Sequence, residues 1–212
     1  MSTGGAKSIT EVSAIVEGQI NAEGEGTSYQ VQWGTTKVYK SSTTVMSAGS
    51  AAAPAQVSTT LKRLRPHTTY HYRIVATSVA GTADGADRTF TTNRRLTFRL
   101  TGLARSYRDS KIATAGLALR IRCSQPCNVR GSLLALAATA KRLRLGRHQV
   151  VLGSGSLRLR RSGKGSLRLR LSHKAKGAIG RVSQIVLRLR IVSTPSGGGP
   201  SVTLTKTVTL KR

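Results

Sequence analysis

Aromatic side chains are scarce in this sequence. Trp, Tyr and Phe together make up 4% of the 212 residues, and beyond residue 93 only Phe98 and Tyr107 are aromatic. Proteins that hold single-stranded nucleic acid stack its bases on aromatic rings placed among their basic side chains. The scarcity therefore argues against specific nucleic-acid recognition. It also indicates a core of small aliphatic side chains, which suits an all-β protein.

Acidic side chains are fewer still. The chain has seven, and Asp109 is the only one in residues 94–212. Hydrolases of glycans need two positioned carboxylates, and the sequence has neither a G-x-S-x-G nucleophile elbow nor a lysine-bearing phosphate loop. Residue types alone leave a Ser-His-Asp site open. We nevertheless predict that the chain is not an enzyme and that it holds no cofactor.

Long apolar runs are absent as well. No stretch approaches the ~18 apolar residues of a membrane-spanning helix, so we expect no transmembrane segment. The start, MSTGGAKSITEV, lacks the apolar region of a secretory signal. Two interpretations stay open, a cytosolic protein or a piece of a longer exported protein.

There are only two cysteines, Cys123 and Cys127, in the stretch RCSQPCNV. Zinc needs four ligands and the other candidates are four scattered histidines, so we predict no metal site. A redox pair more commonly reads C-x-x-C. We predict a disulfide that closes a turn around Pro126, which implies an oxidising, extracytoplasmic compartment. Two buried free thiols are the alternative.

Positive charge, by contrast, is abundant and unevenly spread over a net charge of +28. Residues 1–93 contain 8 Lys and Arg against 6 Asp and Glu, whereas residues 94–212 contain 27 bases against one acid. This asymmetry indicates two units. The basic unit is expected to attract polyanions such as nucleic acid, anionic lipid, or acidic wall polymers and glycans.

The first unit is predicted to consist of short strands between turns, because apolar and polar residues alternate over much of residues 9–92. The stretch LRPHTTYHYRIVATSVAGT, residues 64–82, resembles the E–F corner and F strand of a fibronectin type III domain. The resemblance implies that Tyr70 is the corner tyrosine, with its hydroxyl bonded to backbone a few residues upstream. The family's strand B tryptophan is absent, and Trp33 stands on the expected strand C. No integrin-type Arg-Gly-Asp sequence is present.

Four polar residues of this unit could suggest a site. We expect His67 and His71 to face solvent between core tyrosines, because a metal-binding or general-base role would need acids nearby. Asp84 and Asp87 flank Gly85, and we interpret them as turn residues that bond to backbone.

The second unit shows seven strand-like segments with glycine-rich turns, which predicts another sandwich. Residues 135–145 and 172–179 are predicted to form short helices, the second with Ser172 as its N-cap. The order of segments resembles the C-terminal β-sandwich units that follow fibronectin type III modules in actinobacterial surface proteins. That resemblance implies no activity.

The predicted fold is therefore all-β, with two tandem immunoglobulin-like β-sandwich domains and one or two short helices in the second. We expect a disordered segment over residues 1–7, the fibronectin type III-like sandwich over 8–93 and the basic sandwich over 94–212. The oligomeric state and the rigidity of the connection are not indicated by the sequence.

Leucine and arginine alternate in SLRLRRSGKGSLRLRLS, residues 156–172, and again in LRLRI, residues 187–191. We predict a hairpin with leucines inward and arginines outward, in which Arg158 faces Arg170 and Arg160 faces Arg168. Arg188 and Arg190 would extend this face to six guanidinium groups. Such a face can grip phosphates or carboxylates, or it can be a solvated surface that discourages edge pairing.

The function that we predict is a non-catalytic, extracellular or cell-surface module. It would serve as a spacer, an adhesion protein or a binder of an anionic envelope polymer or glycan. Two alternatives stay open. One is an accessory region of a larger secreted polysaccharide-degrading enzyme, and the other is a nucleic-acid-binding protein.

Overall fold

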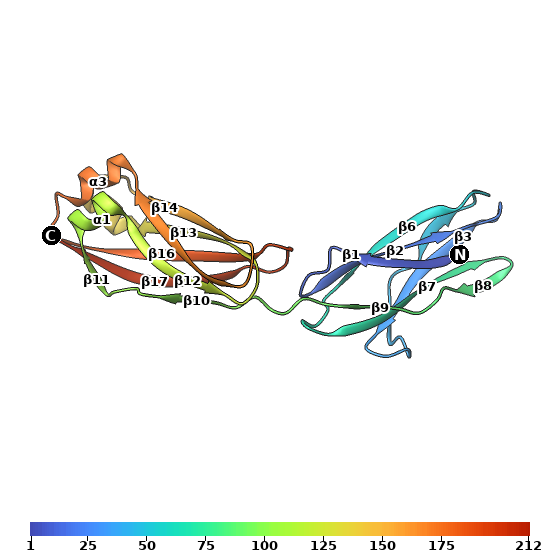
Figure 1. The fold of residues 1–212 in the computed structure, drawn as a ribbon. Coiled ribbons are helices and arrows are strands. Elements are labelled where there is room, and N and C mark those ends of the chain that lie inside the picture. The colour runs from blue at the N-terminus through green and yellow to red at the C-terminus, as the bar shows by residue number, and fades with distance from the viewer. The chain divides into compact units, whose positions relative to one another are not determined.

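The computed structural model describes residues 1–212, and strands dominate it throughout (Figure 1). The chain divides into a first unit, formed by Met1–Arg95 and Gly197–Gly199, and a second unit formed by Leu96–Ser196 and Pro200–Arg212. Each unit has its own hydrophobic core. The prediction of an all-β fold is confirmed.

The first unit is a fibronectin type III-like sandwich of two sheets. One sheet orders its strands β1-β2-β6, and the other orders them β4-β3-β7-β8, with β5 paired to β3 and β9 paired to β7. The strands are β1 (Ser2–Lys7), β2 (Ser13–Ile20), β3 (Thr27–Gly34), β4 (Ser41–Ser42), β5 (Met46–Gly49), β6 (Ala55–Lys62), β7 (Thr69–Ser78), β8 (Gly81–Asp84) and β9 (Arg88–Thr91).

Four aromatic side chains, those of Tyr29, Tyr70, Tyr72 and Phe90, lie in the core of this unit. The rings of Tyr70 and Tyr72 lie 5.7 and 5.6 Å from that of Phe90, measured between centroids. The Tyr70 hydroxyl accepts a hydrogen bond of 2.9 Å from the backbone N–H of Arg65, five residues upstream. This is the bond that the fibronectin type III resemblance implies. It ties the turn before β7 to the strand itself.

The expectation of a disordered segment over residues 1–7 is wrong, because Ser2–Lys7 forms β1 and pairs with β2. Hydrogen bonds rather than apolar burial hold it. The Thr3 hydroxyl accepts from the Ile74 N–H at 3.2 Å, and the Gly4 carbonyl accepts from the Tyr72 hydroxyl at 2.8 Å. A Cβ on Gly4 would lie 2.8 Å from the Glu17 carbonyl oxygen, so the small residues permit this close approach.

The second unit has eight strands in the order β10-β12-β15-β14-β13-β16-β17-β11. We call β10, β12 and β15 the three-strand layer, and β14, β13, β16, β17 and β11 the five-strand layer. The strands are β10 (Phe98–Thr101), β11 (Ser106–Arg108), β12 (Leu117–Cys123), β13 (Cys127–Ala135), β14 (Val150–Leu159), β15 (Gly163–Leu171), β16 (Gln184–Pro195) and β17 (Val202–Lys211).

The core of the second unit lies between these layers and consists largely of leucine and isoleucine. Leu167 and Leu169 on β15, like Leu189 on β16, are 0% exposed. A Cβ on Gly131 would lie 2.6 Å from the Leu169 Cδ2 atom, so the glycine on β13 makes room for a leucine of the facing layer. The leucines therefore point inward, as predicted.

Three short helices complete the second unit, namely α1 (Asp109–Ala115), α2 (Ala137–Arg142) and α3 (His173–Ile179). Ser172 caps α3 as predicted, its hydroxyl accepting from the Ala175 N–H at 3.2 Å. The helix predicted over residues 135–145 shrinks to α2, and Leu136 lies before it with 39% of its surface exposed. Helix α1 was not predicted. None of the helices is long and apolar enough to cross a bilayer.

Candidate anion-binding site

The six arginines singled out in the sequence are all exposed, but they do not form one face. Arg158 lies on β14, Arg188 and Arg190 lie on β16, Arg168 and Arg170 lie on β15, and Arg160 follows β14 in the turn. Their strands belong to both layers. The predicted face of six guanidinium groups is therefore wrong.

The predicted hairpin register is also wrong. Strands β14 and β15 pair only through Gly153 with Leu171 and Ser154 with Arg170. Beyond these pairs β14 continues along β13, and β15 continues along β12. The leucines meet across the core instead, since a Cβ on Gly165 of β15 would lie 2.8 Å from the Leu159 Cδ2 atom of β14. The leucines are thus buried between two layers rather than paired across the predicted hairpin.

On the outer face of the five-strand layer, arginines are interleaved with uncharged side chains. Arg158 lies opposite Asn128, Arg130 lies opposite Ser156 and Val192, and Arg190 lies opposite Ser132 and Thr205. No arginine of this face has another arginine as its direct cross-strand partner. Like charges directly opposite each other destabilise a sheet, so this arrangement reduces the repulsion.

In the three-strand layer, by contrast, like charges lie directly opposite each other at one position. Arg99 on β10 pairs directly with Arg122 on β12, and Arg122 pairs in turn with Lys164 on β15. We call these three residues the basic row. At ~5 Å in water each opposition costs somewhat under 1 kcal/mol, and salt reduces this cost. The next row along the same face, Thr101–Arg120–Ser166, flanks its arginine with hydroxyls.

No acid compensates the basic row. The ion pairs Lys7–Glu17, Lys37–Asp87, His71–Asp87 and Arg73–Asp84 lie in the first unit. Asp109, the single acid after residue 93, is buried, and its Oδ1 accepts a hydrogen bond of 2.5 Å from the neighbouring Ser110 N–H. The positive potential of this surface is therefore screened by solvent and salt alone.

A hollow of about 550 Å³ adjoins the basic row. Its volume lies within the ~300–1,000 Å³ that is common for small-ligand sites. Two guanidinium-bearing residues and several hydroxyls contribute to its wall, and no carboxylate does. The lining residues are Thr97, Arg99, Arg122, Cys123, Ser124, Ser162 and Gly163.

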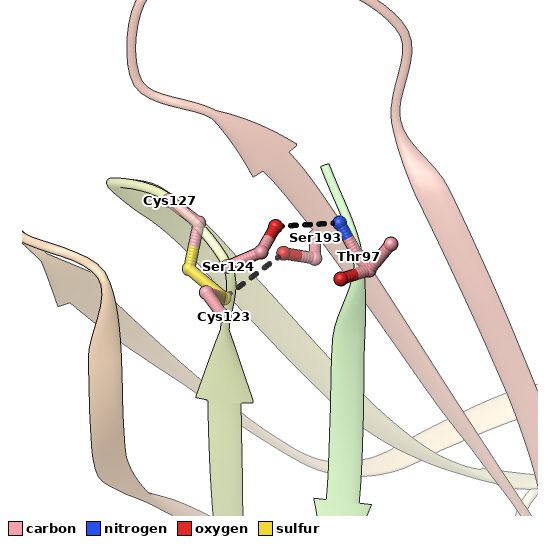
Figure 2. Close-up of a disulfide and its surroundings, with 5 residues drawn as sticks. All are labelled: Thr97, Cys123, Ser124, Cys127 and Ser193. Carbon is pink, nitrogen blue, oxygen red and sulfur yellow. Dashed lines mark hydrogen bonds between the residues drawn. A yellow bond between two sulfur atoms is a disulfide. The ribbon is translucent and has the colours of Figure 1, made fainter. Parts of the chain in front are cut away.

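The wall of the hollow is held by Ser124 and by a disulfide (Figure 2). The Ser124 N–H donates to the Thr97 carbonyl at 3.0 Å, and the Thr97 N–H donates to the Ser124 hydroxyl at 2.9 Å. The predicted disulfide between Cys123 and Cys127 is confirmed, which excludes two free thiols. It joins β12 of the three-strand layer to β13 of the five-strand layer.

The first unit contains a different polar cluster, which the sequence analysis missed. The Asp87 carboxylate lies 2.9 Å from Nδ1 of His71, accepts a 2.6 Å hydrogen bond from the Tyr39 hydroxyl and lies 3.9 Å from Lys37. Asp84 accepts a 2.6 Å bond from Arg73, so the interpretation of both acids as backbone-bonding turn residues is wrong.

The geometry of this cluster shifts two pKa values. Burial raises the pKa of Asp87, but the hydrogen bonds from Tyr39 and His71 outweigh it, and the net pKa lies below its ordinary value. Burial and the hydrogen bond to Asp87 raise the pKa of Tyr39 to about 12. His71 is only partly exposed, whereas His67 is exposed and precedes β7, so the two histidines do not act together.

The comparisons with known proteins describe likeness of fold only. No family model matches the chain, and no curated protein matches it. It is similar to the sensor domain of the anti-sigma factor RsgI4 of Pseudobacteroides cellulosolvens, with 25% identity over 44% of this chain and 93% of that chain and a TM-score of 0.33. It is also similar to the chicken CNTN1 FN1–FN3 domains, with 9% identity over 98% of this chain and 67% of that chain and a TM-score of 0.44. The description of the first unit as fibronectin type III-like rests on its strand order and on the Tyr70 hydrogen bond.

Proposed function

We propose that this chain is a non-catalytic, extracytoplasmic module whose second unit binds an anionic polymer of the cell envelope. One observation carries the proposal. Exposed arginines and lysines cover the outer faces of both layers of the second unit, while the unit holds a single, buried acid. Guanidinium groups bind phosphate and carboxylate through paired hydrogen bonds, so these faces suit a polymer with repeated anionic groups.

The architecture supports a role as spacer or adhesion module. Thirteen of the 27 bases in residues 94–212 stand on paired strands, and the leucines beneath them are buried. The spacing between charges is thereby fixed before a polymer arrives, which reduces the entropy lost on binding. The first unit contributes little net charge, since residues 1–93 contain nearly equal numbers of bases and acids.

The proposed location follows from the disulfide. Disulfides persist in oxidising compartments and are rare in reducing ones, and the chain's two cysteines are joined. We include in the proposal that the second unit is the kind of C-terminal sandwich found in actinobacterial surface proteins. The sequence resemblance described above supports this assignment, and it brings no catalytic residues with it.

The test measures the affinity of the chain for polyphosphate, heparin and duplex DNA over a series of salt concentrations. We expect the logarithm of the association constant to fall linearly with the logarithm of salt concentration. We also expect DNA to be bound no more tightly than heparin at equal salt. A variant R130T/R158T/R190T, here called the face variant, should show a shallower slope. The matched first-unit variant K40T/K62T/R65T should keep the original slope. Absence of salt-dependent binding, or equal losses in both variants, would overturn the proposal.

A further inference from the structure

We propose that the hollow beside the basic row is a specific site for a tetrahedral oxyanion, a phosphate or sulfate ester group on the polymer. This inference rests on the proposed function, which it deepens by assigning the contact to one place. The site consists of Arg99 and Arg122 in the wall of the hollow, with Lys164 next to them on β15.

The basic row places three cations on adjacent strands, where their repulsion opposes folding. Elsewhere in the unit like charges lie directly opposite each other only as the pair Arg108 on β11 and Lys211 on β17. On the five-strand layer each of Arg130, Arg158 and Arg190 faces uncharged partners. In the basic row three cations lie side by side on three adjacent strands with no acid beside them. Sequences depart from such local rules chiefly where function requires it. The row is a departure of this kind.

The donors at the hollow are placed to converge on one bound group. Residues directly opposite each other in an antiparallel pair have Cβ atoms ~5 Å apart, so the guanidinium groups of Arg99 and Arg122 can reach the same bound group. Thr97, Ser124 and Ser162 add hydroxyls to the same wall. Every charged group at the hollow is a hydrogen-bond donor. The site therefore favours an anion and disfavours a cation.

The number of donors indicates the class of anion. A carboxylate has two oxygens, and one guanidinium in the bidentate arrangement satisfies both. A phosphate or sulfate ester offers further terminal oxygens to the second guanidinium and to Lys164. A phosphate monoester also carries a charge of about −1.5 to −2 near neutral pH, which matches two arginines. The site therefore favours tetrahedral oxyanions over carboxylates.

Hydrogen bonds and the disulfide make one wall of the hollow rigid. Two hydrogen bonds tie Ser124 to Thr97, and Cys123 is covalently linked to Cys127. The Cys123 Sγ atom also lies 3.6 Å from the hydroxyl of Ser193, a fully buried residue of β16 (Figure 2). One wall of the hollow is thereby fixed to both layers. A site fixed before binding loses less entropy when the anion arrives.

The experiment compares the full-length chain with a row variant, R99T/R122T/K164T, and uses the face variant as the control that loses the same charge. The probes are sodium tripolyphosphate, heparin and polyglutamate, which present phosphate, sulfate with carboxylate, and carboxylate alone. We expect the row variant to bind tripolyphosphate at least about tenfold more weakly, because hydrogen bonds to charged groups are lost. The face variant should lose about twofold, which is the effect of screened long-range charge.

Stability provides the second readout. At low salt the row variant should unfold at a higher temperature than the original chain, because it loses repulsion, while its affinity falls. A lower unfolding temperature for the folded row variant would mean that these residues serve packing, and it would overturn the site. A C123S/C127S variant should bind tripolyphosphate more weakly while it retains binding to long polyphosphate.

The outcomes separate this inference from the function on which it rests. Equal losses of affinity in the row and face variants would overturn the site and leave polymer binding by diffuse charge intact. Equal affinity for polyglutamate and for tripolyphosphate of matched charge would overturn the ligand class. Stronger binding of heparin than of polyphosphate would assign the group to a sulfate ester, and the reverse order would assign it to a phosphate ester. Failure of the original chain to bind any of these polymers would overturn the proposed function and the site together.

Discussion

The two units of this chain deal with charge in opposite ways on similar β-sandwich scaffolds. In the first unit several charges form ion pairs, such as Lys7 with Glu17 and Arg73 with Asp84. In the second unit the charges have one sign and lie outside, above a core of leucine. The comparison teaches that a sandwich needs only its inward positions to fold. The outward positions are free to carry a binding surface.

The largest effect should come from the inward positions of the second unit. Leu169→Ala removes a side chain that is 0% exposed, and we expect a loss of about 2–5 kcal/mol in the free energy of unfolding. The neighbouring, exposed Arg168→Ala should change it by less than about 0.5 kcal/mol. Chemical denaturation followed by circular dichroism measures both. Similar losses in the two variants would mean that the inward and outward faces are not distinct in energy.

Loss of the disulfide should lower the free energy of unfolding of the second unit alone. Replacing Cys123 and Cys127 by serine opens a short loop, and loop entropy predicts a loss of about 2 kcal/mol. Calorimetry of the full chain should show one transition shifted to lower temperature. Trp33, the single tryptophan, lies in the first unit. Its fluorescence should report an unchanged unfolding transition of that unit. A shifted Trp33 transition would show that the two units do not unfold independently.

Removing one tyrosine hydroxyl from each unit should affect the stability of the two units differently. Tyr70→Phe leaves the Arg65 N–H without its acceptor, and we expect the first unit to lose about 1 kcal/mol. Tyr107→Phe is the matched control in the second unit, where the hydroxyl accepts from the exposed Ala104 N–H at 2.7 Å. It should have the smaller effect, since water can replace the hydroxyl there. A larger loss for Tyr107→Phe than for Tyr70→Phe would mean that the Tyr70 hydroxyl does not stabilise the corner.

The first unit alone should respond to pH through the Asp87 cluster. The folded pKa of Asp87 is lowered, so its contribution is complete above the ordinary value of 3.8 and is lost as the pH falls through the folded value. The folded pKa of Tyr39 is raised, so its contribution is complete below pH 10.0 and is lost as the pH rises toward about 12. The midpoint of the Trp33 transition should fall at both extremes. Asp87→Asn should reduce the fall in this midpoint at both low and high pH. An unchanged pH dependence in this variant would mean that other groups cause it.

The smallest effect should be that of salt on the two units in the absence of ligand. Salt screens repulsion among the bases of the second unit and attraction within the ion pairs of the first. Adding salt should therefore raise the unfolding temperature of the second unit by a few degrees and leave that of the first unchanged or slightly lower. Equal shifts would indicate a general solvent effect rather than repulsion.

Sequence periodicity predicted the faces of the strands but not their partners. The alternation around Leu167 and Arg168 correctly separated inside from outside. It could not show that β14 and β15 pair with different neighbours, because a period of two is compatible with any partner that keeps the leucines together. Local signals such as the cysteine pair and the Ser172 cap were predictable because each needs only a few neighbouring residues.

Two of the missed features, the basic row and the Asp87 cluster, depend on register between distant segments. The basic row brings together Arg99, Arg122 and Lys164 from three strands, and only the pairing of those strands places them side by side. Asp87 reaches His71 across 16 positions of sequence. Strand β1 was missed for a different reason, because its small residues are held by hydrogen bonds to buried groups rather than by apolar burial.

The most direct test of the central claim is the unfolding temperature of each unit with and without polyphosphate. A ligand that binds only the folded second unit must stabilise that unit. The account predicts that polyphosphate raises the second transition in a salt-dependent manner and leaves the Trp33 transition of the first unit where it was. An unchanged second transition, or a shift of the first alone, would contradict it.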